Sequence, residues 1–284
     1  MKGAPGTDLE RERLLARLYD WEHDEFHDDL DLYEALAHRV DGSILEVACG
    51  SGRVLGAVAR FGRELVGIDT SAAMLERARD RLRDASGPVR LFCQDMHADL
   101  PGGPFGLAIL ALSGFGYSLL PGRQVALLHS IAGHLRPDGL LALDLVSPGG
   151  LLDQQENVPI MQRHGAIEGL LAEGSATEVT KWMVQTLHVA DETIELFSIY
   201  DLTGREGRVC RLHDVSRFRF FSRFEIELLL DAAGFQIEGL YGNYELSPFH
   251  DESKRMIVIA RPAPLRKTSR AGGRNVPDGL SSPA

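Results

Sequence analysis

The chain has 284 residues, and its 30 Lys and Arg against 41 Asp and Glu give a net charge of −11. Hydrophobic residues at 44% and charged residues at 25% are ordinary for a folded protein, so the composition excludes a largely disordered chain. No uncharged apolar stretch is long enough for a membrane span, the N-terminus lacks a secretion signal, and the acidic balance disfavours nucleic acid as a partner. The three scattered cysteines form no metal or disulfide pattern and are typical of a reducing compartment, so we expect a cytoplasmic protein.

Residues 1–40 are predicted to form a helical lid segment, because apolar residues recur at helical spacing over 8–38. Within it, the stretch 20–31 carries seven carboxylates, with His23 and His27 four residues apart. The two histidines are not spaced or flanked like a known metal site, so we expect no metal. An acidic mouth for a cationic substrate and a solvated acidic helix remain the two alternatives for this stretch.

Residues 41–149 are predicted to form the core of the fold, because short apolar strands alternate there with amphipathic helices. This alternation predicts a parallel sheet with helices on both faces, whose ligand crevice lies beyond the carboxyl ends of the strands. The turn 136–139 is expected to lead into the last strand of the segment. The expected strands are 44–48, 64–69, 89–93, 107–112 and 140–146.

In residues 150–221, strand-like segments follow one another, which predicts an antiparallel β cap inserted before the closing elements of the core. Residues 222–261 would supply the closing helix and strands, while the tail 262–284 is rich in Pro, Gly and Ser and is expected to be disordered. The whole predicts an α/β fold, a Rossmann-like doubly wound sheet of about seven strands with an antiparallel β cap insertion. The expected cap strands are 177–189, 193–202 and 208–220.

The glycine loop after the first strand carries the strongest functional signal. Gly50 and Gly52 allow a tight turn and a close approach of a ligand to the backbone. Asp69, 17 residues after Gly52, ends the second strand, where a carboxylate can accept both hydroxyls of a ribose. Asp95 follows the third strand and can accept from an adenine amine. The ordered set predicts a nucleoside site.

The type of nucleoside follows from two departures from the dinucleotide fingerprint. Leu55 stands where a GxGxxG loop would have its third glycine. Glu46, four residues before the first glycine, would sit badly beside a pyrophosphate and suits a ligand with a cationic amine. S-adenosylmethionine has such an amine and carries no phosphate.

At these motifs the sequence resembles the class I S-adenosylmethionine-dependent methyltransferases. Residues 44–52 are similar to the first motif of that family, 66–71 to the second, 94–96 to the third, and 135–140 to its turn into the fifth strand. The ends of the chain resemble a small-molecule subgroup. The resemblance implies S-adenosylmethionine as donor, S-adenosylhomocysteine as product, and donor-binding roles for Tyr19, Glu46, Ala48, Gly50, Gly52, Asp69, Thr70, Asp95, Met96 and Ala111.

The sequence therefore predicts a methyltransferase that acts on a nitrogen or oxygen of a small-molecule acceptor. Tyr117, in the loop after the fourth strand, and His213, in the predicted cap, are the candidate catalytic residues. Two alternatives remain. One is an NAD(P)-dependent oxidoreductase or epimerase, and the other is a protein that binds S-adenosylmethionine without turnover.

Overall fold

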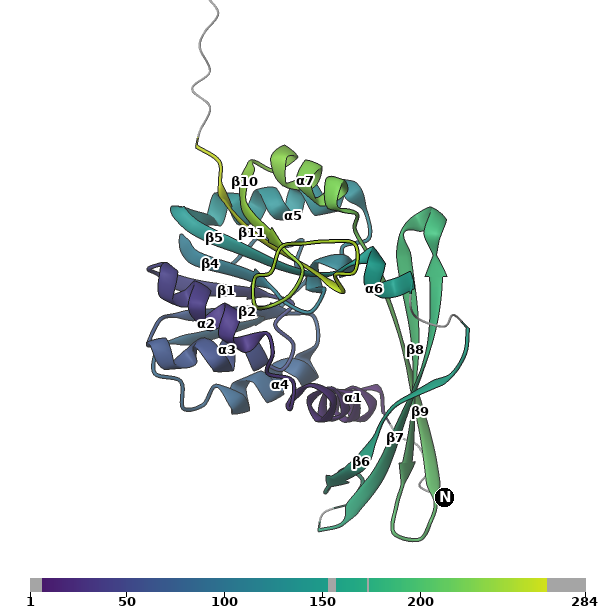
Figure 1. The fold of residues 1–284 in the computed structure, drawn as a ribbon. Coiled ribbons are helices and arrows are strands. Elements are labelled where there is room, and N and C mark those ends of the chain that lie inside the picture. Colours follow the sequence, from purple (N-terminus) through teal and green to yellow (C-terminus); the bar gives the residue numbers. More distant parts are fainter. Residues whose placement is uncertain (1–6, 153–156, 173, 265–284) are drawn as a thin grey trace, which may run out of the picture.

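A computed structural model describes residues 7–152, 157–172 and 174–264 of the chain (Figure 1). Its larger sheet has seven strands in the order β10-β11-β5-β4-β1-β2-β3. Strand β11 is antiparallel to both of its neighbours, and the other pairings are parallel, which confirms the predicted doubly wound sheet. The strands are β1 (Ser43–Val47), β2 (Leu65–Asp69), β3 (Val89–Cys93), β4 (Phe105–Leu110), β5 (Leu135–Val146), β10 (Phe235–Tyr241) and β11 (Arg255–Pro262).

Helices cover both faces of this sheet and enclose two apolar cores. One core joins the sheet to α5 and α7 through residues such as Leu128 and Ile226. The other joins it to α2, α3 and α4 through Leu36, Leu55 and Leu75. The helices are α1 (Asp8–His23), α2 (Leu30–Arg39), α3 (Arg53–Val58), α4 (Ala72–Arg81), α5 (Pro121–His134), α6 (Pro148–Leu152) and α7 (Arg223–Ala232).

Local sequence signals explain where these helices begin. The Ser71 hydroxyl accepts a hydrogen bond from the Met74 amide at 3.3 Å, and Ser222 accepts from Glu225 in the same way, so a serine caps the start of both α4 and α7. One local prediction needs correction. Residues 136–139 lie inside β5 as a bulge, since the register passes from Phe105–Leu135 directly to Leu107–Leu140.

The second sheet, called here the cap sheet, is antiparallel with the order β6-β7-β8-β9. Its strands are β6 (Ile160–Glu168), β7 (Ala176–His188), β8 (Thr193–Thr203) and β9 (Val209–Arg219). Three of these strands were expected from the sequence, but β6 was not. Its side chains are exposed or half-buried throughout, so this edge strand lacks the apolar alternation that marks a strand in a sequence.

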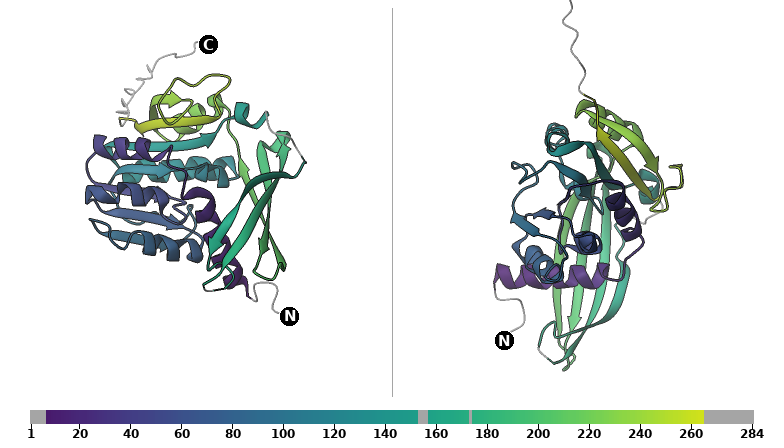
Figure 2. Two further views of the ribbon diagram at one scale, coloured as in Figure 1. Left: turned by 60° about the horizontal axis from the view of Figure 1, so that its bottom comes forward. Right: turned by 90° about the vertical axis from the view of Figure 1, so that its left-hand side faces the viewer.

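Helix α1 lies between the larger α/β unit and the cap sheet, and it contacts the cap sheet on one side and helix α4 on the other (Figure 2). Leu14 and Leu18 pack on the cap sheet, while Asp20 forms ion pairs with Arg77 and Arg81 of α4. Glu22 pairs with a lysine of β7. The acidic stretch is thus largely consumed in ion pairs that hold α1 in place, which differs from a solvated acidic helix.

Three further findings concern whole-chain expectations. Within the described ranges, no helix is both long and apolar enough to cross a bilayer. His, Cys, Asp and Glu side chains form no group of three able to hold a metal ion in the same ranges. The predicted disordered tail lies outside the described residues from position 265 onward.

Candidate active site

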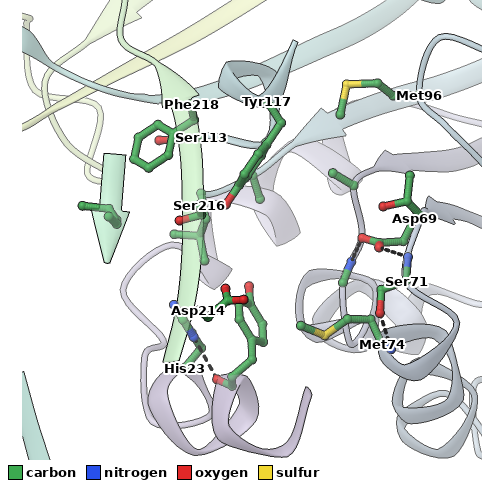
Figure 3. A pocket seen from close by; sticks show the side chains of 18 of the residues that line it. His23, Asp69, Ser71, Met74, Met96, Ser113, Tyr117, Asp214, Ser216 and Phe218 are labelled. Atoms are coloured by element: carbon green, nitrogen blue, oxygen red, sulfur yellow. Dashed lines mark hydrogen bonds between the residues drawn. The ribbon is translucent and has the colours of Figure 1, made fainter. Parts of the chain in front are cut away.

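A cavity of about 1010 Å³ opens between the carboxyl edge of the larger sheet and the cap sheet. Its walls come from the loops after β1, β2, β3 and β4, from the C-terminal part of α1, and from the inner face of β7, β8 and β9. Figure 3 shows Asp69, Ser71 and Met74 on one side of this space and Asp214, Ser216 and Tyr117 on the other. The arrangement matches the crevice expected at the strand ends of a doubly wound sheet.

Asp69, at the end of β2, is held by two backbone amides. One carboxylate oxygen accepts from the Gly50 amide at 2.9 Å, and the other accepts from the Ser71 amide at 2.8 Å. Each oxygen keeps a further lone pair for a ligand. Gly50 has a positive φ of 53°, and a Cβ there would lie 3.9 Å from the Tyr19 ring. The loop and the carboxylate therefore form a narrow polar cradle at the cavity wall.

The loop after β3 adds a second carboxylate beside apolar walls. Asp95 accepts from the His97 amide through one oxygen, at 2.8 Å, and lines the cavity. Met96 and Met74 line the same side with soft apolar surface, together with Thr70. A carboxylate next to apolar walls suits a flat base with an exocyclic amine. Met74 was not among the donor-binding residues that the sequence predicted.

Tyr19, Ala48 and Ala111 also line the cavity, as the sequence predicts, whereas Glu46 and Gly52 do not. The Glu46 side chain is buried and accepts from the Leu55 amide of α3 at 3.2 Å. This burial raises the pKa of Glu46 to about 8. The structure thus places the Glu46 carboxylate behind the loop and not in the cavity wall.

Gly52 serves packing instead of ligand approach. Its φ is 75°, and a Cβ there would lie 3.1 Å from the Cβ of Ala78 in α4. The glycine therefore lets the loop lie against that helix, and Gly52 is not among the residues that line the cavity.

The loop after β4 is strained and firmly held. Leu112 and Ser113 have positive φ values of 45° and 65°, which non-glycine residues rarely adopt. The buried Asp144 of β5 accepts from the Leu112 amide at 2.9 Å, and its backbone oxygen accepts from the Ser113 amide at 2.8 Å. Arg255 pairs with the same carboxylate. This network fixes the loop that delivers Tyr117 to the cavity.

Tyr117 is half-exposed and lines the cavity between the loop and the cap sheet. Its ring lies 5.8 Å from the ring of Phe218, and its hydroxyl hydrogen-bonds with Ser216. Burial is the main cause that raises the pKa of Tyr117, so the phenol stays neutral near pH 7. The predicted candidate is thus at the site, placed by contacts with β9.

The structure contradicts the predicted catalytic role of His213. Its side chain is exposed and packs beside Phe197, on the outer face of the cap sheet. The residues on the opposite face of β9 line the cavity, and Asp214, which follows His213 directly in the chain, is one of them. Because a strand alternates its faces at every residue, the missed residue stands one position from the predicted one. The β9 residues that line the cavity are Asp214, Ser216 and Phe218.

The end of α1 brings charged and aromatic groups to the floor of the cavity. Glu22 pairs with Lys181 and accepts from the Tyr200 hydroxyl at 2.5 Å. His23 stacks on the Tyr19 ring, with ring centroids 4.1 Å apart, and lines the cavity beside Glu22. Sequence analysis had considered His23 only for a metal site, because nothing in the pattern showed that α1 crosses the crevice.

Comparison with known proteins agrees with this geometry. Residues 44–139 match the family described as a methyltransferase domain. The cypemycin N-terminal methyltransferase of a Streptomyces species is 28% identical over 78% of this chain and 85% of its own length. The dTDP-3-amino-3,4,6-trideoxy-alpha-D-glucopyranose N,N-dimethyltransferase of Streptomyces venezuelae is 28% identical over 70% of this chain and 78% of its own length.

Solved structures of methyltransferases also resemble the fold of this chain. An S-adenosylmethionine-dependent methyltransferase from Clostridium acetobutylicum superposes with a TM-score of 0.73 at 17% identity, over 88% of this chain and 98% of that one. The matched segment 44–139 contains the loop in which the Gly50 amide donates to Asp69. These similarities favour methyl transfer over the oxidoreductase alternative.

Proposed function

Because the chain carries a methyltransferase domain of the class I, S-adenosylmethionine-dependent kind, we propose that it methylates a primary amine of a small molecule. The observation that carries the proposal is the position of Asp214. This carboxylate faces the cavity from the cap sheet, across from Asp69 in the donor cradle (Figure 3). A carboxylate on the acceptor side favours a substrate that enters as an ammonium ion.

Aromatic side chains around Asp214 support a cationic acceptor. Tyr117 and Phe218 flank the cavity near Asp214, and Tyr200 lies on the neighbouring strand. Aromatic faces attract an ammonium group through their quadrupole and exclude water from it. Two relatives have names that refer to amino acceptors, an N-terminal methyltransferase and an amino-sugar N,N-dimethyltransferase. Both support nitrogen over oxygen as the methylated atom.

In this proposal, residues at the strand ends of the larger sheet hold the donor, and residues on the cap-sheet side of the cavity hold the acceptor. When bound, S-adenosylmethionine supplies an electrophilic methyl group on a positively charged sulfur. Asp69 and Asp95 would hold the nucleoside part, and the fixed loop at Ala111 would limit its movement. Asp214 and Tyr117 would orient the amine toward the methyl group. Alignment and exclusion of water can supply most of such a rate enhancement, since positioning alone is worth roughly 7–11 kcal/mol in well-oriented reactions.

The experiment is transfer of a labelled methyl group to a matched set of acceptors. The amine probes are dTDP-3-amino-3,6-dideoxyglucose and a short peptide with a free N-terminus. Their controls are the 3-hydroxy sugar and the N-acetylated peptide. Label in an amine and none in its control would support the proposal. Label in the hydroxy sugar would contradict it, and no label in any probe despite donor binding would favour binding without turnover.

A further inference from the structure

We propose that His23 is the general base of this enzyme, with its Nε2 atom as the proton acceptor for the substrate amine. The inference deepens the proposed function and rests on the amine acceptor argued above. Three features of the structure carry it: the position of the ring in the cavity wall, the hydrogen bond that fixes its tautomer, and the free second nitrogen.

The position of the imidazole is set by α1. His23 is the last residue of the helix and, like Asp214 of β9, lines the cavity (Figure 3). Its ring stacks on Tyr19, which lies close to the loop at Gly50. The imidazole is therefore part of the wall of the cavity that holds the residues assigned to the donor and to the acceptor.

The tautomer follows from the hydrogen bond of the other nitrogen. Nδ1 is 2.8 Å from the backbone oxygen of Tyr19, and an oxygen can only accept, so Nδ1 carries the proton. A neutral ring must then have an unprotonated Nε2. Among the described residues, no group hydrogen-bonds to Nε2. The free lone pair belongs to a ring whose orientation is already fixed.

Burial and the surrounding charges together keep the His23 ring neutral before the substrate binds. Burial is the largest cause, and it lowers the pKa of His23 below its ordinary value. The bond to Tyr19 and the charge of Glu22 act in the opposite direction, whereas Lys181 and Arg53 lower the pKa further. The other titratable groups on this side of the cavity are Tyr200 and Asp214.

The proton balance of the step is simple. The acceptor enters as an ammonium ion, one N–H bond breaks, and the proton moves to Nε2, which makes His23 an imidazolium. The freed lone pair on nitrogen forms the new N–C bond while the C–S bond breaks and its electrons stay on sulfur. The imidazolium then releases its proton to water. A positioned base contributes about 10²–10⁴-fold in such reactions.

The test uses variants that separate the two nitrogens. His23→Asn keeps a side-chain N–H that can reach the Tyr19 oxygen but removes Nε2. His23→Ala removes the ring and leaves room for added imidazole. For an amine probe that the wild type methylates, we expect His23→Asn to bind S-adenosylmethionine normally and to lose about 100-fold in kcat. We also expect the acid limb of the kcat/KM profile to disappear, and imidazole to restore turnover in His23→Ala.

Retained kcat in His23→Asn, or failure of imidazole to restore turnover in His23→Ala with donor binding intact, would overturn the proposal. A second measurement needs no acceptor. In the S-adenosylhomocysteine complex, nitrogen NMR should show a protonated Nδ1 and a bare Nε2 for His23 near pH 7, and a protonated Nε2 would also overturn it. If the wild type methylates none of the amine probes, the proposed function fails, and the NMR result then decides only whether His23 has the unprotonated Nε2 that a general base requires.

Discussion

The carboxylate of Asp144 accepts a hydrogen bond from the backbone amide of Leu112 at 2.9 Å and so holds a left-handed residue at the edge of the cavity. The same carboxylate pairs with Arg255 and accepts from the Tyr244 hydroxyl at 3.0 Å. Backbone strain of this kind costs about 1–3 kcal/mol per residue and persists only where the surroundings enforce it. The buried network therefore stabilises the loop that carries Ala111 and Tyr117.

Replacement of Asp144 by Asn should destabilise the protein strongly. The amide keeps an acceptor for Leu112 but leaves the Arg255 guanidinium without its charge partner, a change that costs about 3–5 kcal/mol at buried pairs. The measurement is the free energy of unfolding in urea. Asp138→Asn, at an exposed position of the same strand, is the matched control and should change little. Equal effects of the two variants would show that the network is not what stabilises the loop.

Asp69→Ala should weaken S-adenosylmethionine binding by at least about tenfold, equivalent to about 1.4 kcal/mol. The variant removes the ribose acceptor and also frees the Gly50 and Ser71 amides that the carboxylate now fixes. Titration calorimetry measures the affinity. Asp80→Ala, on the exposed end of α4, should bind as the wild type does. Unchanged affinity in Asp69→Ala would remove the ribose role.

Tyr117→Ala should lower turnover more than donor affinity, because the ring contacts Phe218 and Ser216 on the acceptor side. Tyr117→Phe keeps the ring and should retain most of the activity if the aromatic face is what binds the amine. Steady-state kinetics with an amine probe and calorimetry with the donor separate the two effects. Equal losses of turnover and donor affinity in Tyr117→Ala would contradict a position on the acceptor side.

Asp20→Ala should loosen α1, because its buried carboxylate joins the helix to Arg77 and Arg81 of α4. Hydrogen exchange of residues 8–23 should become faster, and donor affinity should fall because Tyr19 moves with the helix. Asp24→Ala also removes a partner of Arg81, but that carboxylate is about half-exposed, so it should have little effect. The idea fails if both variants exchange at the wild-type rate.

Glu46 should make stability depend on pH in an unusual direction. Burial raises the pKa of this carboxyl to about 8 in the folded protein, from an ordinary value of 4.5. The stability that the protonated group contributes is fully present below pH 4.5 and is lost as the pH rises through about 8. Glu46→Gln cannot lose a proton, so its stability relative to the wild type should rise between pH 5 and pH 8, by about 1.4 kcal/mol for each unit of pKa shift. Urea unfolding of both proteins at several pH values tests this, and a constant difference would contradict it.

The chain order of the core and its donor cradle could be predicted because both depend on local patterns. Gly50 marks a turn by its backbone freedom, and Asp69 ends a short apolar run. Parallel strands then bring their carboxyl ends to one edge, so the neighbourhood of these residues follows from the fold class. The same reasoning placed Asp95, Met96 and Tyr117 near the cavity, where the structure has them.

Which residues the cap sheet presents to the cavity was decided by tertiary structure alone. Residues 209–219 indicate a strand, but whether His213 or Asp214 faces inward depends on what packs against the sheet. The edge strand β6 could not be predicted because its residues do not alternate between apolar and polar types. The positions of Glu46, outside the cavity wall, and of His23, within it, were also decided by tertiary packing. One lies behind a helix and the other ends a helix that crosses the crevice, and such long-range packing leaves no periodic trace in the sequence.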